Sequence, residues 1–246
     1  MTTPEAASPL PLKGAPPADR PSRIRGGRLV HAHGPLLVTG FEPFGGEAIN
    51  PSAQVAQALH GRRIGAAAVV AVVRPCAFDG AVATLREALA THRPQLVLAL
   101  GQAGGRCDLS LERVAINLDD ARSADNCGAQ HIDEPVVAGG PAAYFTTLPV
   151  KAMAAALRQA GYPASVSHSA GTFVCNHVFY ALQHSLAGEH DVRSGFMHLP
   201  YLPEQAARHA GAPSLALATM IDGVAAALAA ALVTRHDARV SEGAMD

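Results

Sequence analysis

The segment that decides the fold is "PLLVTGFEPFGGEAINPSAQVAQALHG", residues 35–61. Its first seven residues form a short apolar run that ends in Gly-Phe, which is typical of a buried β-strand. A helix is predicted next, over residues 50–61, because Asn50 and Pro51 favour a helix start and Gly61 favours a stop. A buried strand followed by a helix is the βα unit from which parallel sheets are built.

The same alternation continues along most of the chain. Further strands are predicted at residues 66–73, 94–102, 164–170 and 195–200, and further helices at 78–92, 149–161, 173–188 and 214–233. Residues 107–146 interrupt this pattern with many Asp, Asn, Gly and Pro residues, which predicts extra strands and a long functional loop. We therefore predict the α/β class: a single-domain α/β/α sandwich with a twisted, mostly parallel but mixed central sheet. Ligands should collect beyond the carboxyl ends of its strands.

Composition favours one folded domain with two loose ends. The chain has 246 residues, of which 49% are hydrophobic, enough for one large core. Residues 1–34 are rich in Pro and Arg and contain no apolar signal-peptide core, so we expect a disordered extension. The domain is expected to cover residues 35–234, and residues 235–246 to form a frayed tail.

The Ala-rich segment 214–233 is the only candidate for a membrane span. Asp222 interrupts it, and the apolar run that follows is shorter than the ~20 residues a span requires. We expect a buried helix capped by Ser214 instead.

Charge and cysteine usage exclude several classes of function. The formal net charge is -1 with no basic stretch, which argues against nucleic acid or an anionic membrane surface as the main partner. The four cysteines show no CxxC spacing, and the histidines no metal-binding spacing, so we expect neither a disulfide framework nor a metal or other cofactor. "GQAGGR" (101–106) lacks the spacing of a dinucleotide loop. A small or peptidic substrate in the reducing cytoplasm fits best.

Cys175, in "SHSAGTFVCNHVFYALQH" (167–184), has two possible roles. Helical spacing aligns it with Phe179, Leu182 and Leu186 in an apolar stripe, which favours a core thiol. Its position after a Gly turn puts it in the first helical turn, where unpaired N–H groups and the helix dipole stabilise a thiolate. A free thiol with a pKa of about 8.5 still needs a base.

Three histidines are candidates for that base. His177 is two residues from the cysteine on the same helix and points elsewhere, and His184 is more than two turns away, so both are expected to be surface or packing groups. His198 ends the apolar strand in "SGFMHLPYLPEQ", where α/β proteins assemble their sites. On its own, a structural role for His198 is equally compatible with the sequence.

Glu112 is the candidate acid. In "LSLERVAIN" it alternates with apolar residues, and a buried carboxylate needs a partner. Spacing alone gives equal weight to an ion pair with Arg106 or Arg113 and to a catalytic role that orients a histidine.

Phe41 and Phe44 flank a proline at the end of the first predicted strand. The pair is either the hydrophobic cap of a turn or the wall of a pocket for a small flat ligand.

Five segments, in order between Leu36 and Ala230, together resemble the pyroglutamyl peptidase I family of cysteine peptidases. They are "TGFEPFGGEAINPS", "GQAGGRCDLSLERVAINLDDAR", "DNCGAQHIDEPVVAGGPAAYFTTLPV", "SHSAGTFVCNHVFYAL" and "GFMHLPYLPEQ". The resemblance implies removal of an N-terminal 5-oxoproline (pyroglutamyl) residue from peptides through a thioester. It also implies a cytoplasmic enzyme without a cofactor, commonly a homotetramer.

The resemblance also implies a role for individual residues. Cys175 corresponds to the nucleophile, His198 to the base and Glu112 to the acid. The substrate-binding positions correspond to Phe41, Phe44, Asn50, Gln102, Arg122, Phe173 and Val174. Among these, the backbone of Gln102 would read the lactam N–H, and Arg122 would lie near the oxyanion.

The chain departs from the family pattern at two places. Ser123-Ala124-Asp125-Asn126 stands where the family usually has Ile-Pro-Asp-Asn, which removes an apolar wall residue and a rigid proline, and His168 stands where the family often has Asn. Two alternatives therefore remain: a cysteine amidase of different acyl specificity, and a non-catalytic protein that binds 5-oxoproline or peptides.

Overall fold

A computed structural model describes residues 34–243, so the predicted extension 1–34 lies outside the described residues apart from Gly34. The main sheet has seven strands. In spatial order they are β2 (Arg63–Ile64), β3 (Ala67–Arg74), β1 (Leu36–Phe41), β4 (Leu96–Gln102), β9 (Arg193–Leu199), β5 (Leu109–Glu112) and β8 (Ala164–Ser167). A separate antiparallel pair joins β6 (Val114–Ile116) to β7 (Ala143–Phe145).

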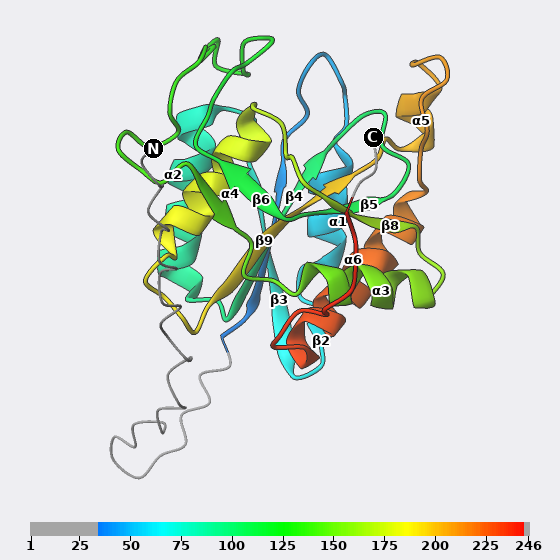
Figure 1. Ribbon diagram of the computed structural model, residues 1–246. Helices are drawn as coiled ribbons and strands as arrows, with labels where there is room; N and C mark the ends of the chain where they lie inside the picture. The colour runs from blue at the N-terminus through cyan, green and yellow to red at the C-terminus, as the bar shows by residue number, and fades with distance from the viewer. Residues whose placement is uncertain (1–33, 244–246) are drawn as a thin grey trace, which may run out of the picture. The chain divides into compact units, whose positions relative to one another are not determined.

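The helices lie in two layers on opposite faces of the sheet (Figure 1). One layer contains α1 (Pro51–Leu59), α3 (Val150–Gln159) and α6 (Leu217–Val233), and the other contains α2 (Phe78–His92) and α4 (Val174–Ser185). A single turn, α5 (Pro203–Ala206), follows β9. This arrangement confirms the predicted α/β/α sandwich.

The sheet is mixed because its edges reverse direction. Strands β3, β1, β4 and β9 are parallel to one another, whereas β5 pairs antiparallel with β9 and parallel with β8. The short β2 pairs antiparallel with β3. The four parallel strands therefore bring their carboxyl ends to one edge, as βα repeats require.

The first βα unit forms as the sequence predicts. The Asn50 side chain accepts a hydrogen bond of 3.0 Å from the Ser52 N–H and caps α1. Gly61 follows the end of the helix with φ +75°, in the left-handed region that favours glycine. At Gly40 in β1, a Cβ would lie 2.3 Å from the Ser52 carbonyl oxygen, so the glycine lets the helix start close to the strand.

The predicted cap of the last helix was wrong. Helix α6 begins at Leu217 with Ala216 as its N-cap, and no side chain caps it. Ser214 instead forms a β-bridge with Tyr201, and the Leu215 N–H donates to the Tyr201 carbonyl at 2.9 Å. This extended pairing delays the helix by one turn. No helix among the described residues is long and apolar enough to cross a membrane.

Residues 235–243, within the tail that the sequence analysis expects to be frayed, contain no helix or strand. They nevertheless contact α3. The Asp237 carboxylate accepts hydrogen bonds from the backbone N–H groups of Lys151 at 3.3 Å and Ala152 at 2.9 Å, which satisfies donors at the start of that helix. Glu242 forms an ion pair with Arg158.

Candidate active site

Cys175 is the second residue of α4, as the sequence analysis predicts, and its thiol is pressed against β4. The helix starts at Val174, and its N-cap, Phe173, offers no capping side chain. A Cβ placed on Gly101 would lie 2.8 Å from the Cys175 Sγ, so only glycine leaves room for the thiol there. The register partner of Gly101 in the neighbouring strand β9 is His198. The thiol and the imidazole therefore stand over adjacent strands on the same face of the sheet.

His198 and Glu112 are in direct contact. The His198 Nδ1 lies 2.7 Å from Glu112 Oε1, and the two side chains are 4% and 0% exposed. The reversal of β5 makes this contact possible, because it pairs Ser110 with His198 and brings the end of β5 alongside β9. Nδ1 is occupied by the carboxylate, which leaves Nε2 as the nitrogen available to another group.

Glu112 contacts both an arginine and a histidine, the two kinds of partner between which its sequence spacing could not decide. Its Oε1 also lies 2.9 Å from an Arg106 guanidinium nitrogen, whereas the Arg113 guanidinium stacks over the Phe145 ring at 5.9 Å. Arg106, rather than Arg113, is therefore the ion-pair partner. The second carboxylate oxygen, Oε2, is buried and has no hydrogen-bond partner among the described residues.

Burial raises the pKa of the Cys175 thiol well above its ordinary range. Cys76 and Glu112 raise this pKa further, whereas the cations Arg74 and Arg106 lower it. The resting thiol is therefore protonated at neutral pH. It can become a nucleophile only if a neighbouring group accepts its proton as the reaction proceeds.

A pocket of about 510 Å³ opens beside the start of α4. Three of the predicted substrate-binding residues line it: Phe44, Arg122 and Phe173. The Phe44 and Phe173 rings are 6.3 Å apart, which gives the pocket an aromatic wall. Ser123, the first residue of the altered family segment, also lines it.

The other four predicted binding residues are buried and are not among those that line this pocket: Phe41, Asn50, Gln102 and Val174. Asn50 holds the loop after β1, because its side-chain N–H donates to the Glu42 carbonyl at 3.0 Å. Gln102 has its side-chain oxygen fixed by the Gln205 amide at 2.8 Å. These two side chains support the loops around the site.

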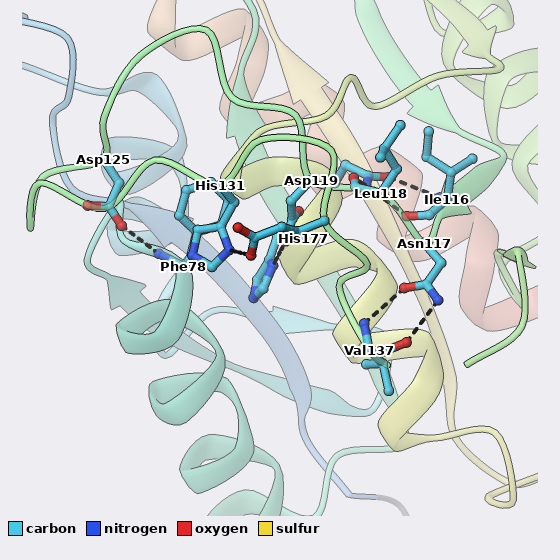
Figure 2. Close-up of polar contacts among 11 residues, drawn as sticks. Phe78, Ile116, Asn117, Leu118, Asp119, Asp125, His131, Val137 and His177 are labelled. Carbon is cyan, nitrogen blue, oxygen red and sulfur yellow. Dashed lines mark hydrogen bonds and ion pairs between the residues drawn. The ribbon is translucent and has the colours of Figure 1, made fainter. Parts of the chain in front are cut away.

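The loop that carries Arg122 is held to both helices of its layer (Figure 2). Asp119 lies 2.6 Å from the His177 Nδ1 on α4, and the Asp125 carboxylate accepts from the Phe78 N–H at the start of α2 at 2.9 Å. His177 was expected to be a surface or packing group, and the structure makes it the partner of a buried carboxylate. Sequence spacing could not reveal this pair, because its members are 58 residues apart.

Comparison with known proteins identifies the family. The pyroglutamyl peptidase family model matches residues 35–234, most of the chain. This chain belongs to the pyroglutamyl peptidase family. Among its relatives, the pyrrolidone-carboxylate peptidase of Cupriavidus necator is 60% identical over 210 residues, which cover 85% of this chain and 97% of the relative. The corresponding enzyme of Erwinia tasmaniensis is 56% identical over 209 residues, 85% of this chain and 98% of the relative.

Solved structures of pyroglutamyl peptidases share the fold. Pyroglutamyl peptidase I from Bacillus amyloliquefaciens aligns with a TM-score of 0.82 and 43% identity, covering 85% of this chain and 100% of that one. Pyrrolidone carboxyl peptidase from Thermococcus litoralis aligns with a TM-score of 0.81 and 36% identity, covering 85% and 99%. The predicted family is confirmed, and the chain is an enzyme of this family, a hydrolase acting on peptide bonds.

Proposed function

We propose that this enzyme is a cysteine peptidase that removes N-terminal 5-oxoproline from peptides, with Cys175 as nucleophile, His198 as base and Glu112 as the acid that orients the histidine. Two neighbouring contacts carry the proposal. Glu112 lies 2.7 Å from His198, and the Cys175 thiol lies over Gly101, which pairs with His198 in the adjacent strand. A nucleophile, a base and a group orienting the base are the parts that nucleophilic catalysis requires.

The reaction starts with proton transfer. His198 Nε2 accepts the proton of the Cys175 thiol while the sulfur forms a bond to the carbonyl carbon of the 5-oxoproline residue. The carbonyl π electrons move to its oxygen. Backbone N–H groups in the first turn of α4 meet this oxyanion, because no side chain caps Phe173 and those donors stay available. Arg122, on the wall of the adjoining pocket, adds a positive charge.

Collapse of the intermediate completes the first half. The peptide C–N bond breaks, and the imidazolium of His198 donates its proton to the leaving amine, so the acyl group remains as a thioester on Cys175. Water then attacks the thioester carbonyl carbon while His198 accepts one of its protons. The C–S bond breaks and the imidazolium returns this proton to the sulfur, which releases 5-oxoproline and restores the thiol. Glu112 stays ionised and stabilises each imidazolium stage.

Selectivity follows from the absence of charge on the substrate ring. A 5-oxoproline residue has no charged α-amine, so aromatic walls and backbone hydrogen bonds suffice to hold it. A charged N-terminal amine would lose part of its hydration beside the Phe44 and Phe173 rings, a cost that the uncharged 5-oxoproline ring does not have, so such a peptide is disfavoured.

A fluorogenic assay tests this proposal. The purified protein is incubated with a pyroglutamyl-coumarin amide and with alanyl and prolyl coumarin amides; release from the first alone is expected. C175S should abolish release, whereas C107S, which alters an exposed cysteine, should leave it unchanged. Release from the control amides would indicate an amidase of different acyl specificity, the alternative that the Ser123 wall favours. Binding of 5-oxoproline without release from any amide would indicate a binding protein.

We further propose that the enzyme works as a homo-oligomer, a tetramer by its family resemblance, in the cytoplasm. Two exposed apolar side chains support an interface between copies: Phe145 is 68% exposed and Val233 is 84% exposed. A solution mass measurement tests the oligomer, and a monomeric mass at working concentration would contradict it.

A further inference from the structure

Arg74, the last residue of β3, is buried with no hydrogen-bond or ion-pair partner among the described residues. Its side chain is 0% exposed, and none of its three guanidinium nitrogens has a hydrogen-bond partner among the described residues. Burying a charge in this way is costly unless a group of opposite charge lies beside it. A position that tolerates this cost is a candidate for a functional role.

The sheet places Arg74 in the same row as the active-site residues. Arg74 pairs with Phe41, and Gly101 pairs with His198. Thr39 pairs with Ala99, so Phe41 and Gly101, two residues further along, are also level. One row thus crosses four adjacent strands in the order Arg74, Phe41, Gly101, His198. Since side chains in one row point to the same face, all of them face the layer of α2 and α4.

The guanidinium leans along this row toward the thiol. Its central carbon lies 4.4 Å from the centroid of the Phe41 ring, over the strand that separates β3 from β4. The Cys175 Sγ sits over Gly101 in β4, the next strand. Adjacent strands are ~4.8 Å apart, so the guanidinium and the thiol are separated by about the spacing of two neighbouring strands. His198 flanks the thiol on the opposite side.

Among the charged groups near the thiol, Arg74 is the cation that can stabilise a thiolate. Burial lowers the pKa of Arg74 to about 9, so it is still charged at neutral pH, and its interactions with Cys175 and Cys76 act in the opposite direction. The charge of Arg106 also lowers the pKa of the thiol, but this arginine forms an ion pair with Glu112 at 2.9 Å. The remaining groups are His198, which takes the proton, and Cys76, a buried free thiol.

We propose that Arg74 is the buried counter-charge of the Cys175 thiolate, a positioning residue that accelerates the nucleophilic step without touching the substrate. The inference rests on the proposed function, since it requires Cys175 to be the nucleophile. When the thiol ionises, its negative charge balances the buried positive charge of Arg74. The neutral thiol cannot do this, so the guanidinium favours the thiolate over the thiol.

The test measures thiol reactivity apart from turnover. Iodoacetamide alkylation of Cys175 is followed at pH 7 by mass spectrometry of its peptide, because the exposed Cys107 and Cys127 also react. R74M removes the charge at similar length and should slow Cys175 alkylation about tenfold, equivalent to about one pKa unit. R74K keeps the charge and should retain most of the wild-type rate. kcat should fall with R74M while KM stays unchanged.

R193M is the matched control. Arg193 is also a partly buried arginine, but it lies at the other end of β9 and donates to the Ala231 and Thr234 carbonyls at 2.6 and 2.7 Å. R193M should lose stability and keep the alkylation rate. R74M should show a urea midpoint no lower than that of the wild type, because it removes an unpaired buried charge. If R74M does not fold, R74Q provides the uncharged comparison.

Three outcomes would overturn the inference: a folded R74M alkylated at the wild-type rate, a change in KM alone, or a folded R74K as slow as R74M. In each case an inactive C175S would leave the proposed function standing. Pyroglutamyl release by C175S at the wild-type rate would refute both proposals.

Discussion

Adding one methyl group under Cys175, the proposed nucleophile, should disable the enzyme. In Gly101→Ala the new Cβ would lie 2.8 Å from the Cys175 Sγ and 2.8 Å from the Phe196 Cζ. Phe196 is 1% exposed and packs against Phe179 with ring centroids 5.8 Å apart, so it has no free space to enter. The thiol, in the first turn of its helix, is the neighbour that must move.

The size of the effect follows from the missing space. Non-bonded heavy atoms are comfortable at about 3.5–4.0 Å, so the thiol must shift by roughly 1 Å. A misplacement of about 1 Å costs on the order of 100-fold in rate, because reacting groups must be held in a near-attack geometry. Overpacking a core costs about 1–3 kcal/mol of stability, which a domain of this size survives. Gly101→Ala should therefore fold and lose about 100-fold in kcat/KM.

The assay combines kcat/KM on the pyroglutamyl-coumarin amide with urea unfolding. Gly223→Ala is the matched control: its Cβ would meet the Leu109 Cδ1 at 2.4 Å in the opposite layer, so it should lose stability with little change in kcat/KM. Gly188→Ala meets no atom within 4 Å and should alter neither property. Wild-type kcat/KM in a folded Gly101→Ala would refute the placement of the thiol over Gly101.

Three further predictions use the polar contacts. E112Q removes the charge that stabilises the imidazolium of His198 and should lower kcat on the same amide by about 10³–10⁴-fold, with circular dichroism showing a retained fold. H177A leaves the buried Asp119 carboxylate unpaired and should cost about 3 kcal/mol in urea unfolding; H177A as stable as the wild type would contradict the pair. Burial raises the pKa of Asp125, but hydrogen bonds from backbone N–H groups lower it more, to a net value below its ordinary one. Its contribution to stability is therefore present above the unfolded pKa of about 3.9 and is lost as the pH falls through the folded value. As the pH falls from about 5 through the unfolded and then the folded pKa of Asp125, the wild type should lose more stability than D125N in urea titrations, and parallel curves would contradict this.

Local rules predicted the elements well, because the elements depend on local chemistry. The helix predicted over residues 78–92 matches α2 (Phe78–His92), and the start of α1 follows from the Asn50 cap. Ser214 shows where such rules end. It is a good capping residue, but a β-bridge to Tyr201 holds it in an extended conformation, and no local pattern encodes that long-range pairing.

The site was less accessible to local reasoning. Spacing alone could not separate the two roles of Glu112, and the structure shows contacts with both Arg106 and His198 through one carboxylate oxygen. The residues had to be assigned through the family resemblance, because β5 approaches β9 only through a reversal of strand direction. No sequence motif marks Arg74, which stands out only because its guanidinium nitrogens have no hydrogen-bond partner within residues 34–243.

The two interpretations of Cys175, core thiol and nucleophile, describe one physical situation. The helix stripe that continues with Phe179 and Leu182, both 0% exposed, fixes the first turn of α4 against β4. The same packing leaves Cys175 only partly accessible to water and raises the pKa of its thiol, which makes a lone thiolate unfavourable. Precise placement and easy ionisation therefore oppose each other at this position. In the proposed mechanism, His198 on one side and the Arg74 cation on the other, which has no hydrogen-bond partner among the described residues, let the enzyme keep this placement and still ionise the thiol when a substrate is bound.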